Sequence, residues 1–193
     1  MRLVILDGFT ANPGDIGWEM IEQLTTAEGE KIEIAIYERT TPSETLCHAK
    51  GADMLLTNKV IINDEIMSQL PELKYIGVLA TGYNVVDIQA AQKRGITVTN
   101  IPAYSTASVA QMVMAHLLHI TQQVGPHSQA VREGAWQQST DFCFWNEPLT
   151  ELSGMTMCIV GLGNTGMATA RIAQSLGMQV MAWTRKSKEE LQS

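Results

Sequence analysis

Three glycines near the end of the sequence have the spacing of a phosphate-binding turn. Gly161, Gly163 and Gly166 follow an apolar run and open a second apolar segment with helical spacing. In such a turn the first glycine allows the tight bend, the second lets the backbone approach a pyrophosphate, and the third lets the helix pack closely on the strand. The free N–H groups and positive dipole end of the helix attract phosphate oxygens. The pattern therefore predicts a dinucleotide site that includes Asn164 and Thr165, with a glycine-rich turn without a ligand as the alternative.

The residues after the next apolar run bear on which dinucleotide would bind. An acid some twenty residues beyond such a turn commonly binds the adenosine ribose, but residues 182–188 contain none. The uncharged Thr184 would not repel a 2′-phosphate, and Arg185 and Lys186 would attract one. We therefore expect NADP in preference to NAD, with a solvated basic turn as the alternative.

Short apolar runs alternate with helical patterns along the chain, which is typical of βαβ units around a parallel sheet. Strands are expected over residues 3–6, 32–37, 54–56, 75–79, 97–99, 157–160 and 179–183. Helices are expected from about residue 15, from Thr41 with Glu44 as its capping partner, and over 63–70, 87–94, 106–124 and 165–176. The helix over 106–124 carries an apolar stripe formed by Val109, Val113, Leu117 and Ile120. With Pro102 as a boundary marker, the chain is expected to form two α/β domains, residues 1–100 and 101–193.

Composition excludes several classes of function. The 193-residue chain has a net charge of −7, and this acidic balance disfavours nucleic acid and anionic membranes as partners. No apolar run approaches the roughly 18 residues that span a bilayer, and the opening MRLVILDGF is expected to form a strand rather than a signal peptide. The three cysteines, without a CxxC spacing, favour reduced thiols in a cytoplasmic protein over disulfides, and we expect no metal site.

The chain resembles the D-isomer-specific 2-hydroxyacid dehydrogenases, and within them the glycerate dehydrogenase (hydroxypyruvate reductase) branch. The resemblance rests on residues 6–19, 56–59, 73–87, 94–111, 141–145 and the glycine turn. Several matches in the right order are more specific than any one of them. The resemblance implies a flavodoxin-like substrate and catalytic domain followed by a Rossmann NAD(P)-binding domain, of which this chain would hold only the N-terminal part.

The resemblance also assigns roles to individual residues. Thr81 and Gly82 would present backbone N–H groups to the substrate carboxylate, as a glycine-containing loop after a strand can do. Lys59 could add a positive charge there, with an ordinary solvated lysine as the alternative. Val109 matches a position that faces the nicotinamide, which is compatible with a core position on the long helix.

The family transfers hydride between NAD(P)H and a small 2-keto acid such as hydroxypyruvate or glyoxylate. Its catalytic arginine, glutamate and histidine lie later in the nucleotide domain than Ser193. We therefore expect this chain to be an inactive fragment of a homodimeric enzyme. The alternative is a non-catalytic protein that dimerises or senses nucleotides.

Overall fold

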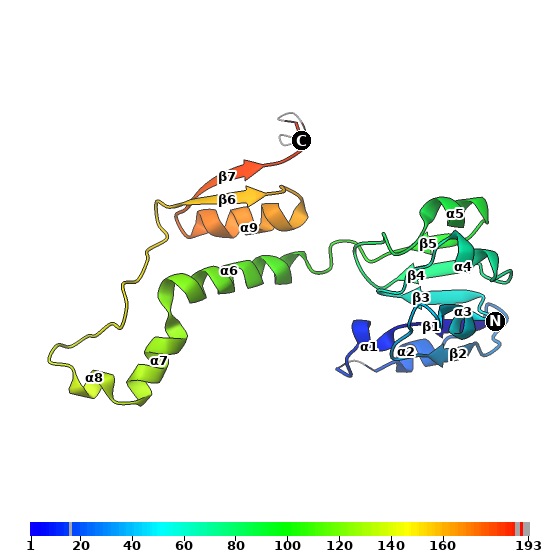
Figure 1. The fold of residues 1–193 in the computed structure, drawn as a ribbon, viewed down its shortest axis with the longest axis horizontal. Coiled ribbons are helices and arrows are strands. Elements are labelled where there is room, and N and C mark those ends of the chain that lie inside the picture. Colours follow the sequence, from blue (N-terminus) through cyan, green and yellow to red (C-terminus); the bar gives the residue numbers. More distant parts are fainter. Residues whose placement is uncertain (16, 188–189, 191–193) are drawn as a thin grey trace. The chain divides into compact units, whose positions relative to one another are not determined.

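The computed structural model of the protein describes residues 1–15, 17–187 and 190. The chain divides into two compact units, Met1–Pro102 (unit 1) and Ala103–Ser193 (unit 2), and each contains a parallel sheet with helices (Figure 1). Among the residues so described, no helix combines the length and the apolar character needed to cross a bilayer.

Unit 1 is built on a five-stranded parallel sheet with the strand order β2-β1-β3-β4-β5. The strands are β1 (Arg2–Ile5), β2 (Glu33–Ile36), β3 (Met54–Thr57), β4 (Tyr75–Val78) and β5 (Thr97–Thr99). This is the flavodoxin-like order of doubly wound sheets, so the predicted fold class is confirmed, and each strand begins and ends within one residue of its expected position. Because all the strands are parallel, the loops that follow them lie along one edge of the sheet.

Apolar side chains of the strands fill the interior of unit 1. Val4, Leu55 and Ile76, on three adjacent strands, are 0% exposed, as expected of parallel strands covered on both faces. Asn63 and Asp87 each cap a helix by accepting a hydrogen bond from a backbone N–H of its first turn, at 3.0 and 2.9 Å. The helices are α1 (Gly8–Ala11), α2 (Glu19–Glu22), α3 (Thr45–Ala49), α4 (Asp64–Ser68) and α5 (Ile88–Lys93).

Two helices of unit 1 begin later than the sequence predicts. The helix expected from Thr41 begins at Thr45. Glu44 does accept hydrogen bonds from the hydroxyl and the N–H of Thr41, at 2.7 and 3.0 Å, and these two bonds, the hydroxyl one first, lower the pKa of Glu44. They close a turn ahead of the helix instead of its first helical turn. The helix expected from about residue 15 begins at Glu19.

Unit 2 contains two parallel strands and the helix that connects them. β6 (Thr156–Val160) pairs with β7 (Gln179–Trp183), and α9 (Asn164–Ser175) lies between them in the chain. The helix α6 (Thr106–Gln122) packs against α9. A small core fills this contact, formed by the buried residues Met114, Leu152, Ala173 and Met178.

The long helix predicted over 106–124 is interrupted. Gln123 has φ 46°, in the left-handed region, and a new helix, α7 (Val124–Arg132), begins after it. A further short helix, α8 (Ala135–Gln138), was not predicted. The four residues of the expected apolar stripe lie on α6, but the buried positions of this helix are Ala110 and Met114, and Val109 and Ile120 are 43% and 71% exposed.

Candidate functional site

The glycine turn, residues 161–166, connects β6 to α9, and each glycine meets a different requirement. Gly161 has φ +98°, a conformation that residues with side chains rarely adopt. At Gly166 an added Cβ would lie 2.2 Å from the carbonyl oxygen of Gly161, so only glycine lets the helix begin this close to the strand. Nothing lies within 4 Å of a Cβ built on Gly163, and its open side can therefore be approached by a ligand.

The backbone of this turn offers a row of N–H donors. Within the described residues, the N–H groups of residues 162–166 have no protein acceptor, whereas the N–H of Met167 donates to the carbonyl of Gly163 at 2.9 Å. Asn164 and Thr165 are the first two residues of α9, which is 12 residues long. An anion over Gly163 would therefore meet several donors and the positive end of a helix dipole.

The end of β7 lies beside the glycine turn. The N–H of Gly161 donates to the carbonyl of Trp183 at 2.8 Å, so the residues that follow Trp183 leave the sheet next to the turn. Thr184 is half-buried, and its hydroxyl accepts a hydrogen bond from the N–H of Lys186 at 3.3 Å. The side chains of Arg185 and Lys186 are exposed and form no ion pair within the described residues. The structure thus brings the two predicted parts of the dinucleotide site together.

Val109, the remaining cofactor candidate, lies near the start of α6. Its N–H donates to the carbonyl of Ser105 at 2.9 Å, which holds it in the first turns of the helix. Its side chain is 43% exposed beside the fully buried Ala110. Within unit 2 it is therefore an apolar side chain with a face left open, and not a core residue.

A second row of N–H donors follows β4 in unit 1. No protein acceptor is found among the described residues for the N–H groups of residues 81–84. The hydroxyl of Thr81 donates to the carbonyl of Ile101 at 2.9 Å, and the side-chain amide of Asn100 donates to the carbonyl of Thr81 at 2.8 Å. The loop that contains Thr81 and Gly82 is therefore held in place while its N–H groups point at no protein oxygen, which is the arrangement that binds an anion.

Lys59 follows β3, the strand that pairs with β4. Its backbone N–H and that of Asn58 donate to the carboxylate of Asp7, at 2.6 and 2.8 Å. Asp7 is only 3% exposed, so it determines where this segment leaves the sheet. The side chain of Lys59 is exposed, as both its predicted role and the solvated alternative require. Sequence reasoning missed Asp7 and Asn58, although both directly follow apolar strand segments.

Two of the four histidines have side-chain partners within their own unit. The ring of His48 stacks on Tyr37 with centroids 3.7 Å apart, and its Nδ1 lies 2.9 Å from the hydroxyl of Thr40. His127 Nε2 accepts from the N–H of Asn146 at 3.3 Å, and the other two histidines are exposed on α6. Among the described residues, no three His, Cys, Asp or Glu side chains are grouped so that they could hold a metal ion.

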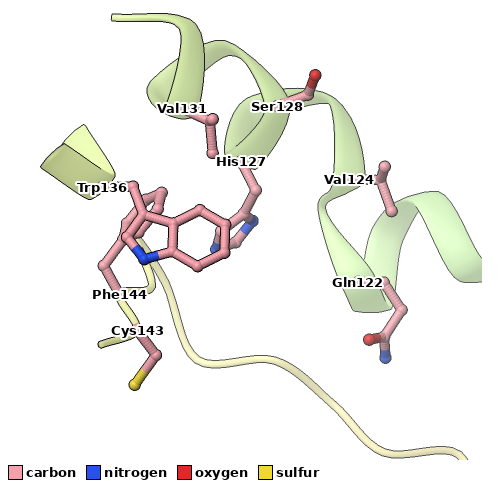
Figure 2. Close-up of a pocket in the computed structure, with 8 residues that line it drawn as sticks. All are labelled: Gln122, Val124, His127, Ser128, Val131, Trp136, Cys143 and Phe144. Carbon is pink, nitrogen blue, oxygen red and sulfur yellow. The ribbon is translucent and has the colours of Figure 1, made fainter. Parts of the chain in front are cut away.

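An apolar pocket of 390 Å³ lies in the segment after α6. Figure 2 shows Trp136, Phe144 and His127 gathered on one side of it. The indole N–H of Trp136 donates to the carbonyl of Phe142 at 3.0 Å. Next to the pocket, Phe142 and Trp145 are 91% and 68% exposed. Exposed apolar surface of this kind is characteristic of contacts with other proteins.

Comparisons with known proteins agree with these features. The model of the D-isomer specific 2-hydroxyacid dehydrogenase catalytic domain matches residues 10–192. The chain is 46% identical over 186 residues to a hydroxypyruvate reductase of Blautia hydrogenotrophica, covering 95% of the chain and 56% of the relative. It is 38% identical over 148 residues to a glycerate dehydrogenase of Methylorubrum extorquens, covering 76% and 47%. The predicted resemblance is confirmed, and the chain spans about half the length of the curated relatives it matches.

A solved structure shares the fold. The NADPH-dependent glyoxylate/hydroxypyruvate reductase of Sinorhizobium meliloti, in complex with NADP and malonate, matches with a TM-score of 0.67 and 24% identity. The match covers 97% of this chain and 54% of that one. At this identity the likeness supports the fold.

Proposed function

Because the chain belongs to the D-isomer specific 2-hydroxyacid dehydrogenase family, we propose that it is part of an oxidoreductase acting on a small 2-keto or 2-hydroxy acid, with hydroxypyruvate and glyoxylate as the first candidates. The observation that carries the proposal is the two rows of backbone N–H groups without protein acceptors, residues 81–84 in unit 1 and residues 162–166 in unit 2. The first has the chemistry to bind a carboxylate and the second a pyrophosphate.

In unit 1, the N–H groups of Thr81 and Gly82 would hold the substrate carboxylate, and Lys59 would add a positive charge. Holding the carboxylate orients the neighbouring carbonyl carbon, which is where positioning lowers the barrier. In a form of the protein that turns over hydroxypyruvate, Gly82→Pro, which removes one N–H, should raise KM about tenfold, the value of one charge-assisted hydrogen bond. Gly82→Ala is the control, since it keeps the N–H and places its Cβ 3.3 Å from the Asn84 side chain. Equal KM values for both variants would contradict the role of the N–H.

In unit 2, the glycine turn would bind the pyrophosphate, and the half-exposed Val109 would cover one face of the nicotinamide. The nicotinamide, when bound, donates or accepts the hydride. Thr184, Arg185 and Lys186 favour NADP over NAD, because a neutral residue and two cations suit a 2′-phosphate. NADP is also bound in the related reductase of Sinorhizobium meliloti.

Proton transfer is the step for which these residues provide no group. His48 is the only histidine of residues 1–102, and its ring is engaged with Tyr37 and Thr40. General acid–base assistance contributes about 10²–10⁴-fold, so we expect the 193-residue chain to be inert with hydroxypyruvate and NADPH in a steady-state assay. Turnover on the order of 1–10³ per second would contradict this.

The proposed enzymatic activity is tested on the protein in its longest natural form. If the reading frame continues beyond Ser193 into sequence with an arginine, a glutamate and a histidine in the family context, that form should reduce hydroxypyruvate or glyoxylate. Binding of NADP without turnover in that form would instead favour the non-catalytic, nucleotide-sensing alternative.

The apolar surface next to the 390 Å³ pocket would bind a second copy of the chain. The exposed Phe142 and Trp145 offer large apolar surfaces that association would bury. Light scattering at micromolar concentration should give a dimer, and Trp145→Ser should weaken it, while a strictly monomeric wild-type chain would contradict the proposal. The three cysteines are free and exposed, which suits the reducing cytoplasm.

A further inference from the structure

Unit 1 contains a cavity of 660 Å³ at the carboxyl edge of its sheet. Its wall includes residues that follow three neighbouring strands: Asp7 and Thr10 after β1, Arg39 and Thr40 after β2, and Lys59 after β3. The strand order brings these three ends side by side, and the winding of the sheet reverses between β1 and β3. In doubly wound sheets, the crevice outside the carboxyl ends of the strands at such a reversal is where ligands bind.

Most polar groups of the cavity wall are already paired within the protein. Asp7 accepts hydrogen bonds from two backbone N–H groups, at 2.8 and 2.6 Å, and from the hydroxyl of Thr10 at 3.1 Å. The hydroxyl of Thr40 donates to the carbonyl of Leu6, and Asn63 accepts a hydrogen bond from the first turn of α4. These groups build the wall and have little capacity left for a ligand.

Two cations of the wall are not paired in this way. Neither Arg39 nor Lys59 forms a side-chain hydrogen bond or an ion pair within the part of the chain that the structure describes. The guanidinium carbon of Arg39 lies 4.7 Å from the ring centroid of Phe9, and this cation–π contact limits the positions that the side chain can take. The remaining carboxylate of the wall, Glu65, is exposed at the start of α4.

We propose that this cavity binds a small anionic ligand, a phosphate or a carboxylate, through Arg39 and Lys59. A guanidinium presents a planar fork of N–H donors that matches both anions. The site differs from the loop of residues 81–84, which follows β4 and contributes none of the residues that line the cavity. Because Lys59 lines the cavity and is also the lysine proposed to add charge at that loop, an anion in the cavity would compete with a substrate carboxylate for that one charge.

The test is a titration of the isotope-labelled chain with inorganic phosphate and, separately, with malonate, followed by NMR without cofactor. We expect saturable shifts of the backbone signals of Thr10, Thr40 and Lys59 with at least one probe, and the probe that binds more tightly identifies the anion. Arg39→Gln should weaken this binding about tenfold, equivalent to about 1.4 kcal/mol, and Arg39→Lys should weaken it less. Lys50→Gln is the matched control: the carbonyl of Lys50 contacts the side chain of Arg2, at the amino edge of the sheet, and this change should leave binding unaltered.

The outcomes of this titration distinguish binding in the cavity from binding at the loop of residues 81–84. Shifts confined to residues 81–84, or binding unaffected by Arg39→Gln, would overturn the anion site and leave the proposed function standing. Shifts in the cavity without shifts in the loop would support the anion site and count against the proposed function. Glu65→Gln should raise the affinity because it removes a repelling charge, and a fall in affinity would contradict binding through the charges of the cavity wall.

Discussion

The two units differ in how completely their sheets are covered. In unit 1, Val4 and Ile5, consecutive residues of β1 whose side chains point to opposite faces of the sheet, are both 0% exposed, so this strand is buried on both faces. In unit 2, Ile159 is 9% exposed on the covered face, while Val160 and Trp183, which pair across β6 and β7 on the other face, are 76% and 64% exposed. Parallel sheets normally have both faces covered.

The comparison distinguishes the features that form a binding site from those that stabilise the fold. Unit 1 has its own core, and the loop of residues 81–84 depends on long-range contacts such as those of Thr81 with Ile101 and Asn100. The glycine turn of unit 2 depends on local features, the positive φ of Gly161 and the close approach of Gly166. We therefore expect the loss of a buried long-range partner in unit 1 to act mainly on stability, and changes in the glycine turn of unit 2 to act mainly on NADP binding.

The largest effect is expected from Asp7→Ala in unit 1. The change leaves the N–H groups of Asn58 and Lys59 without an acceptor in a buried position, which should lower the free energy of unfolding by about 3 kcal/mol. Asp87→Ala, which removes only an exposed helix cap, should cost about 1 kcal/mol. Urea unfolding measures both. Equal losses of unfolding free energy would mean that Asp7 does not hold the sheet edge. A loss of NADP binding in Asp7→Ala would contradict the expectation that this change in unit 1 leaves the site in unit 2 unaffected.

The next effect contrasts two glycines of unit 2. In Gly166→Ala the new Cβ would meet the carbonyl oxygen of Gly161, an overpacking that should destabilise the turn by about 2 kcal/mol and abolish NADP binding. In Gly163→Ala the Cβ would meet no protein atom within 4 Å, so hydrogen exchange of α9 should stay unchanged while NADP binding weakens. Normal binding by Gly163→Ala would show that the pyrophosphate does not approach over that residue.

Sequence and structure agree where the determinants are local. The strands of unit 1 were predictable because strands buried on both faces are continuous apolar runs, and the glycine turn was predictable because its requirements lie within six residues. The helix break at Gln123 was not predictable, since a left-handed residue that is neither glycine nor asparagine leaves no sequence signal. The buried role of Asp7 was not predictable either, because its partner Asn58 lies 51 residues away. An acid after a strand otherwise looks like a surface residue.

A smaller effect is expected at the end of β7. In a form of the protein that turns over with NADPH, Thr184→Asp together with Arg185→Ala should shift the preference towards NADH by about tenfold, or about 1.4 kcal/mol. The change introduces a charge that repels a 2′-phosphate and removes one that attracts it. The measurement is kcat/KM with each cofactor. Lys31→Ala in unit 1 is a control that should leave the ratio of the two kcat/KM values unchanged. A wild-type protein that already favours NADH tenfold would contradict a preference of this turn for NADP.

The smallest effect is a pH dependence confined to unit 1. Asp53 accepts a hydrogen bond from the backbone N–H of Arg2 at 2.8 Å, and its carboxylate lies 3.3 Å from the ammonium of Lys74. The bond from Arg2, and then the contact with Lys74, lower the pKa of Asp53 below its ordinary value of 3.8. Since the folded state favours the ionised form, the stabilisation is fully present above this ordinary value and is lost as the pH falls through the lowered pKa.

Asp53→Asn tests this dependence because the variant has no charge to lose. The difference in unfolding free energy between wild type and variant should be largest near neutral pH, below about 1 kcal/mol as for other exposed ion pairs, and should shrink below about pH 4. The pKa of Glu44 is also lowered, by its hydrogen bonds from Thr41, but the contribution of Glu44 is common to both proteins and cancels in the difference. Lys74→Gln should reproduce only part of the change, because the bond from Arg2 remains. A difference that grows in acid would mean that Asp53 is stabilised in its protonated form, and a matching change in the hydrogen exchange of α9 would mean that the two units are coupled.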